Sequence, residues 1–106
     1  MAFALVQSAE VVITGVNNTT LAYPSNVTAG NLLVNSHSHW ISGADQAITT
    51  PTDTLAHVYA GAVAEQDGGA FNSLRSFYVG NSTGGANTVT FDIGGAGTGD
   101  ITAVIS

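Results

Sequence analysis

Residues 31–41, NLLVNSHSHWI, carry the pattern that decides the fold. The run has no 3.6-residue period, and apolar and β-branched runs of this length between turn residues indicate a β-strand. Residues two apart in a strand share a face, so Asn35, His37 and His39 lie on one side. The opposite side carries the remaining residues of the centre of the run, Ser36, Ser38 and Trp40.

Similar runs follow one another along the whole chain, and glycine, asparagine, aspartate or proline separates them in turn roles. We expect seven strands, at about residues 3–14, 20–23, 31–41, 54–65, 72–80, 87–93 and 101–106. Short strands at this close spacing predict one all-β domain over residues 1–106, built as a two-sheet antiparallel β-sandwich.

Two of these runs leave alternatives open. Residues 54–66, TLAHVYAGAVAEQ, are rich in alanine, and a helix is the alternative to the strand expected there. The last run, ITAVIS, extends to Ser106 without a closing turn. Either it ends a sheet, or it leaves an edge with which another chain can pair, and self-association through such an edge strand would give a homo-oligomer.

Composition and charge narrow the classes of partner. Apolar residues make up 44% of the 106 residues, which is enough for a hydrophobic core, whereas charged residues make up only 8%. Arg75 is the single strong cation and the net charge is −6, so nucleic acid and anionic membrane surfaces are poor partners. The chain has no cysteine, no apolar stretch of membrane-spanning length and no basic, apolar start typical of a signal peptide.

Most of the chain resembles small Ig-like β-sandwich modules of bacterial surface proteins and phage structural proteins. The resemblance rests on TAGNLLV at residues 28–34 and GGANTVTF at residues 84–91. It implies a structural or adhesive scaffold module without catalytic residues. Plain apolar residues are expected in the middle of the third strand of such a module, and residues 35–39, NSHSH, depart from that expectation.

The third histidine of the chain, His57, lies in the next expected strand. If residues 31–41 and 54–65 pair antiparallel about a centre near residue 48, His57 falls opposite His39, and Tyr59 falls opposite His37. Three imidazoles would then meet on one face of the sheet. This arrangement predicts a zinc site with His37, His39 and His57 as ligands.

HSHW at residues 37–40 is also similar to the zinc-binding strand of the α-type carbonic anhydrases. In that family a His-x-His pair precedes tryptophan, and the neighbouring strand supplies the third histidine. The resemblance implies that Asn35 orients the first ligand, and we expect Tyr59 beside the site. Where the family has a carboxylate two residues before the third ligand, this chain has Leu55. An enzyme-like triplet on a module-like chain suggests a site engineered into a β-sandwich.

Three neutral imidazoles would leave zinc with an open position, where bound water ionises near neutral pH and can attack CO2 or an activated ester. No catalytic side chain beyond the ligands is predicted. The alternative is a non-catalytic module whose histidines have no chemical role. We expect the histidines on the outer face or in a groove, with Trp40 inside, because buried imidazoles need hydrogen-bond partners. The opposite orientation stays open.

Overall fold

The computed structural model describes residues 4–41, 48–67, 72–94 and 98–106, and it describes residues 63–67 and 72 by their backbone alone. Within these ranges every regular element is a β-strand, and paired strands run antiparallel. The expected all-β two-sheet sandwich is confirmed, with eight strands in place of about seven. Among the described residues, no helix has the length and apolar character needed to cross a membrane.

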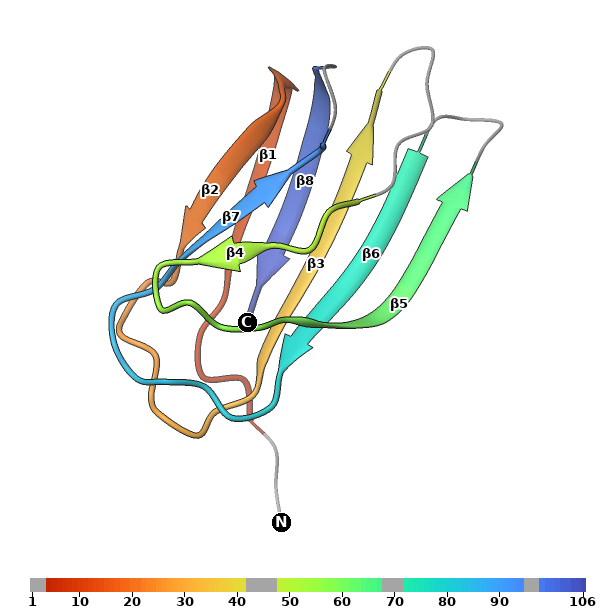
Figure 1. Cartoon of the computed structure of the whole chain (residues 1–106). Helices are drawn as coiled ribbons and strands as arrows, with labels where there is room; N and C mark the ends of the chain where they lie inside the picture. The colour runs from red at the N-terminus through yellow and green to blue at the C-terminus, as the bar shows by residue number, and fades with distance from the viewer. Residues whose placement is uncertain (1–3, 42–47, 68–71, 95–97) are drawn as a thin grey trace.

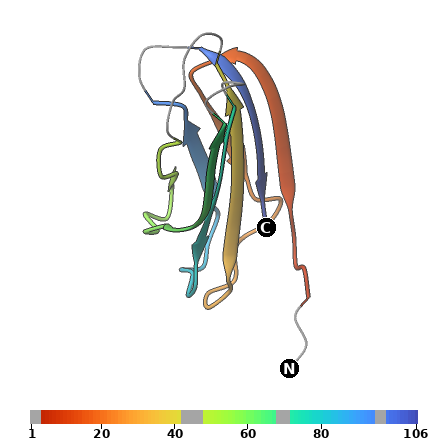
Figure 2. The ribbon, with the colours of Figure 1, turned by 90° about the vertical axis from the view of Figure 1, so that its right-hand side faces the viewer.

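The strands form two sheets. The larger sheet has the order β1-β8-β3-β6-β5. Its members are β1 (Ala9–Val16), β8 (Gly99–Ile105), β3 (Leu33–Trp40), β6 (Asn72–Val79) and β5 (Ala60–Asp67). The smaller sheet has the order β2-β7-β4, with β2 (Asn18–Ala22), β7 (Thr88–Asp92) and β4 (Thr52–Asp53). The smaller sheet lies across the larger one (Figure 1), and Figure 2 shows the two layers from the side.

The core lies between the sheets and follows from the two-residue period of the strands. In β8, Ile101, Ala103 and Ile105 are fully buried, whereas the residues between them are exposed. Val89 and Phe91 of β7 meet them from the smaller sheet. Alternation of this kind, with one face of each sheet packed and the other in solvent, is typical of antiparallel sandwiches.

The first strand differs from its predicted bounds. It was expected over residues 3–14, but among the described residues it begins at Ala9 and continues to Val16. Gly15 adopts a left-handed conformation with φ of 68°, and the register with β8 shifts between Ile13 and Val16. Gly15 therefore makes a β-bulge inside the strand instead of the turn that its sequence suggested.

The strand expected over residues 54–65 is wrong in its first half, and so is the helical alternative. The chain leaves β4 after Asp53, turns, and enters β5 at Ala60. The Asp53 carboxylate accepts the backbone N–H groups of Leu55 and His57, and Ala56 has a left-handed φ of 57°. These bonds bend the chain away from both extended and helical structure.

The expected pairing of residues 31–41 with residues 54–65 is also wrong. β3 pairs with β6 on one side and with β8 on the other. His39 lies opposite Ser73 and Ile101, and His57 is not among its partners. The reason is topological, because the chain between β3 and β5 passes through β4 in the other sheet.

Candidate functional site

His37 and His39 lie inside the sandwich, so the outward orientation that we favoured is wrong. The exposed fraction is 0% for His37 and 3% for His39. Pairing with β8 aligns His37 with Ala103 and His39 with Ile101, and cross-strand partners share a face of the sheet. Trp40, expected in the core, consequently points outward and is 41% exposed.

The His37 ring packs among other rings and makes no hydrogen bond in the described part of the chain. Its centroid lies 5.2 Å from the ring of Phe91 and 5.6 Å from that of His39, both in edge contacts. Burial, and then the neighbouring His39, lower the pKa of His37 to about 4, while Asp92 acts in the opposite direction. His37 is therefore neutral at physiological pH.

Asn35 and Arg75 lie beside His37 and His39 on the inner face of the larger sheet. The Asn35 side chain is fully buried, and neither of its amide atoms makes a regular hydrogen bond with the described residues. Arg75 lies opposite His37 in the ladder, and its guanidinium stacks 4.9 Å from the centre of the Phe77 ring. We call Asn35, His37, His39 and Arg75 the inner polar stripe.

His57 occupies a different place, in the segment between β4 and β5. Its Nδ1 lies 2.7 Å from Oδ2 of Asp53, and its Nε2 accepts the backbone N–H of Thr83 at 2.8 Å. Since Nε2 is an acceptor, the ring is neutral and carries its proton on Nδ1. Both ring nitrogens are thus engaged in hydrogen bonds within the protein.

Asp53 is the centre of this second cluster. Its side chain is fully buried, and besides the bonds from Leu55 and His57 it accepts hydrogen bonds from the Tyr59 hydroxyl at 2.7 Å and the Asn87 amide at 2.9 Å. Burial alone would raise the pKa of Asp53, but the bonds from Tyr59, Asn87 and His57 outweigh it and hold that pKa below its usual value. We call Asp53, His57, Tyr59 and Asn87 the Asp53 cluster.

The predicted zinc ligands thus fall into two groups. His37 and His39 are neighbours in the inner polar stripe, whereas His57 belongs to the Asp53 cluster. Tyr59, expected opposite His37, binds Asp53, and burial followed by this bond raises the pKa of its phenol. The Asn35 side chain lies close to Tyr59 and partly opposes this rise in the pKa of the phenol. Within the described ranges, no three His, Cys, Asp or Glu residues form a group that could hold a metal ion.

Sequence reasoning missed Asp53, Thr83 and Asn87. The segment DTLAH, residues 53–57, does contain a usable signal, because aspartate commonly caps the backbone two or more residues ahead in a turn. Nothing local identifies Thr83 and Asn87, which bind the cluster from the connection between β6 and β7.

The solvent-facing side of the larger sheet carries a row of exposed apolar residues. They are Val12, Trp40, Leu74, Tyr78 and Val104, with exposed fractions from 40% to 73%. The ladder registers set small hydroxyl residues between them, and Ser36 and Ser76 are bonded across β3 and β6 at 3.0 Å. We call this surface the outer face.

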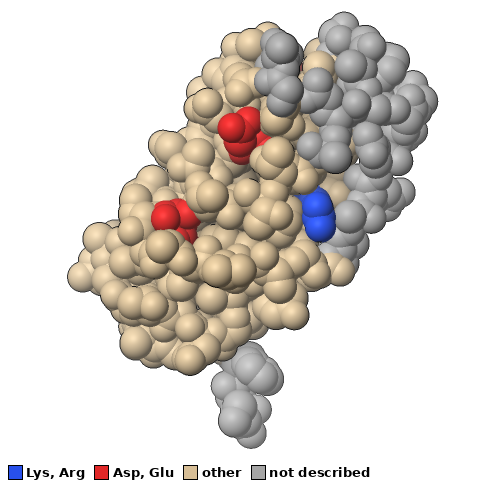
Figure 3. Space-filling view, viewed as in Figure 1, with Lys and Arg blue, Asp and Glu red and all other residues tan. Residues whose placement is uncertain are grey.

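Charge is sparse on the outer face. Among residues whose side chains are described, Glu10 lies at the β1 edge and Asp100 near one end of β8. The opposite side of the molecule, seen in Figure 3, also shows few charged side chains. An apolar surface of this kind commonly marks a contact with another protein.

No protein-family model, curated protein sequence or solved structure matches this chain. The likenesses to Ig-like modules and to the zinc strand of carbonic anhydrases therefore stay predictions.

Proposed function

We propose that this protein is a non-catalytic structural module that associates with further copies of itself through the outer face. The observation that carries the proposal is the row of exposed apolar side chains across four adjacent strands, centred on Leu74 and Val104. Leaving such a row in water is unfavourable, and a second sheet can cover it by face-to-face packing.

The size of the outer face fits a small contact. Strands lie about 4.8 Å apart and rise about 3.3 Å per residue, so four strands of seven residues cover about 440 Å². Two such faces bury about 900 Å² in total, slightly below the roughly 1,000 Å² of a stable specific interface. The expected complex is therefore a weak or moderate dimer, or one contact of a larger assembly.

Charge supports a protein partner of the same kind. The net charge of −6 repels nucleic acid and anionic membranes, whereas the middle of the outer face has no charged side chain among those described. Glu10 and Glu65 are the cross-strand neighbours of Val104 and Leu74, so two copies must meet with these acidic residues offset from one another. The acidic residues described at its border, Glu10 and Asp100, make the association stronger at high salt.

Sedimentation equilibrium over a wide concentration range tests the proposal. The unaltered protein should associate reversibly, and Leu74→Glu should shift it to monomers by at least tenfold in Kd because it places a charge at the centre of the contact. Val58→Glu is the matched control, since Val58 is 89% exposed but lies outside the outer face. A monomer that persists to about 1 mM, a concentration that corresponds to only about 4 kcal/mol of binding, would refute the proposal.

A zinc centre is the second candidate, and one observation favours it. Both nitrogens of His37 lack hydrogen bonds among the described residues, and the ring of His39 is adjacent. Recruiting His57 would require breaking its bonds to Asp53 and Thr83, so we expect no tight zinc binding. Calorimetric titration with zinc tests whether the protein has this metal centre. Tight 1:1 binding that is lost in His39→Ala would establish the metal site, and CO2 hydration and ester hydrolysis would then be assayed.

A further inference from the structure

Thr54 and Asn87 hold a hydroxyl and a carboxamide in contact between β4 and β7. Thr54 directly follows β4 and Asn87 directly precedes β7, and the backbone N–H of Thr54 donates to the Thr88 carbonyl, which continues the ladder of these strands. The Thr54 hydroxyl donates to Oδ1 of Asn87 at 3.3 Å and has a longer contact, 3.5 Å, with the Ala86 carbonyl. The backbone N–H of Thr88 donates to the same hydroxyl oxygen at 3.0 Å. These contacts fix a hydroxyl nucleophile beside a side-chain amide.

The buried Asp53 carboxylate sets the orientation of the Asn87 amide. It is ionised and can only accept hydrogen bonds, because its pKa is held below the usual value. Nδ2 of Asn87 donates to Oδ2 of Asp53 at 2.9 Å, so the carbonyl oxygen of the amide, Oδ1, faces Thr54. Tyr59 and His57 hold the same carboxylate oxygen at 2.7 Å each. Asp53 is therefore a positioning residue for the contact between Thr54 and Asn87.

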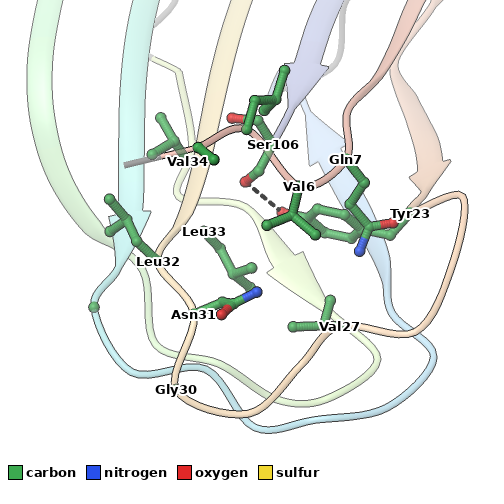
Figure 4. A pocket seen from close by; sticks show the side chains of 13 residues that line it. Val6, Gln7, Tyr23, Val27, Gly30, Asn31, Leu32, Leu33, Val34 and Ser106 are labelled. Carbon is green, nitrogen blue, oxygen red and sulfur yellow. Dashed lines mark hydrogen bonds between the residues drawn. The ribbon is translucent and has the colours of Figure 1, made fainter. Parts of the chain in front are cut away.

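The acceptor of Thr54 distinguishes this contact from other hydroxyl contacts in the molecule. The Tyr23 hydroxyl donates to the Ser106 carbonyl at 3.3 Å (Figure 4), and the Thr49 hydroxyl donates to the Asp92 carbonyl at 2.6 Å. Those acceptors are backbone oxygens. The acceptor of Thr54 is a side-chain carboxamide, whose nitrogen can leave as ammonia without a break in the chain.

We infer that Thr54 and Asn87 form a side-chain ester, with release of ammonia, that joins the end of β4 to the start of β7. Oγ1 of Thr54 bonds to Cγ of Asn87, and the hydroxyl hydrogen passes to Oδ1, which it already contacts. The bond between Cγ and Nδ2 then breaks, the carbonyl re-forms, and the hydrogen moves from Oδ1 through solvent to Nδ2, which leaves as ammonia. One hydroxyl and one primary amide thus give one ester and one ammonia, without an oxidant, a reductant or a further reactant. Asn87 is buried, which shields the ester from water, whereas Thr54 lies at the surface and gives ammonia a route to solvent.

The ester gives a covalent link to a chain that has no cysteine. A link of this kind restricts the unfolded chain, as a disulfide does. The strand β4 has only two residues, Thr52 and Asp53, and the ester secures this short strand to β7. Both strands belong to the smaller sheet, whereas the outer face belongs to the larger one, so this inference does not depend on self-association.

Cleavage after Arg75 tests the link, because Arg75 is the only lysine or arginine in the chain and lies between the two linked positions. The unaltered protein is incubated in its folded state at neutral pH, denatured, digested with trypsin and weighed by mass spectrometry. A linked molecule stays one species, made of residues 1–75 and 76–106, and is lighter than the sum of the two fragments by one ammonia. Hydroxylamine, which under mild conditions cleaves esters and leaves amides intact, should then separate it into two fragments.

Three variants make the result specific. Thr54→Val keeps the size of the side chain but removes the nucleophile, so the linked species should be lost. Thr54→Ser keeps a hydroxyl and should retain the link, which separates the chemistry from an effect of misfolding. Thr49→Val is the matched control, since it removes a hydroxyl that donates to a backbone carbonyl, and it should link as the unaltered protein does. Two separate fragments from the unaltered protein, or a linked species that persists in Thr54→Val, would overturn the inference.

Discussion

Asp53 and His57 form a closed pair in which Oδ2 and Nδ1 lie 2.7 Å apart and the backbone N–H of His57 donates to Oδ1 of the same carboxylate at 3.0 Å. The other ring nitrogen of His57 accepts from Thr83. The pair thereby fixes the segment between β4 and β5 to the connection between β6 and β7. It is a structural link between loops, since no nitrogen of this imidazole is left to act on a ligand.

The Asp53 cluster predicts a loss of stability in acid. The folded-state pKa of Asp53 lies below its unfolded value of about 3.9, so its contribution is fully present above about pH 4 and disappears as the pH falls through the lower, folded value. Urea unfolding across this range should show the decline. In Asp53→Asn the stability at pH 7 should fall by about 3 kcal/mol and the decline below pH 4 should be smaller. An unchanged acid slope in the variant would assign the effect to other carboxylates.

Protonation of His37 should cause a second loss of folding stability, at a higher pH than the loss caused by Asp53. Its pKa is about 4 in the folded protein and about 6.5 in the unfolded chain, so protonation favours unfolding as the pH falls from about 6.5 to 4. Above about pH 6.5 the stability is retained in full. The difference corresponds to about 3 kcal/mol, and His37→Val should remove it. Equilibrium unfolding of both proteins at pH 7 and pH 4.5 measures the slope, and parallel slopes would contradict the prediction.

Asn35 predicts a stabilising substitution. Its amide is fully buried without a regular hydrogen bond to the described residues, and valine suits a central strand. Asn35→Val should therefore raise the free energy of unfolding by about 1–2 kcal/mol. Thermal and urea unfolding provide the comparison. A destabilised variant would mean that Asn35 makes a necessary contact, such as the one through which it acts on Tyr59.

The start of β8 requires a residue without a side chain at position 99. A Cβ added there would overlap the backbone carbonyl of Trp40 and crowd Ile41, so Gly99→Ala should cost about 1–3 kcal/mol. Gly80→Ala is the matched control, because an added Cβ there meets nothing within 4 Å. Both variants are compared by urea unfolding. Equal, small effects would show that β8 can shift away from β3 at little cost.

The sequence predicted those strands whose alternation of inward and outward residues can be seen within the strand itself. The run at residues 31–41 corresponds to β3, and the run at residues 72–80 corresponds to β6, each within two residues of its bounds. The break after Asp53 was not predicted, because the bonds that Asp53 makes to the backbone compete with the β-propensity of the following residues.

The site was less predictable than the fold. The period places His37 and His39 on one face but does not say which face is inward, and that depends on the register with β8. The sequence suggested a hairpin between consecutive runs, whereas the partners of β3 are β6 and β8. His57 was consequently expected near His39 and instead lies in the Asp53 cluster.

The position of β3 also determines when the molecule can fold. β3 is the central strand of the larger sheet, yet one of its two partners is β8, the last strand of the chain, and β1 at the sheet edge pairs only with β8 as well. Until β8 is synthesised, β1 has no partner and β3 has only β6. Pairings between strands so distant in sequence carry a loop-closure entropy that slows folding, so the larger sheet is completed only after β8 is available. Until then the apolar residues of β1 lack their strand partner, and unpaired apolar strands of this kind are prone to aggregation.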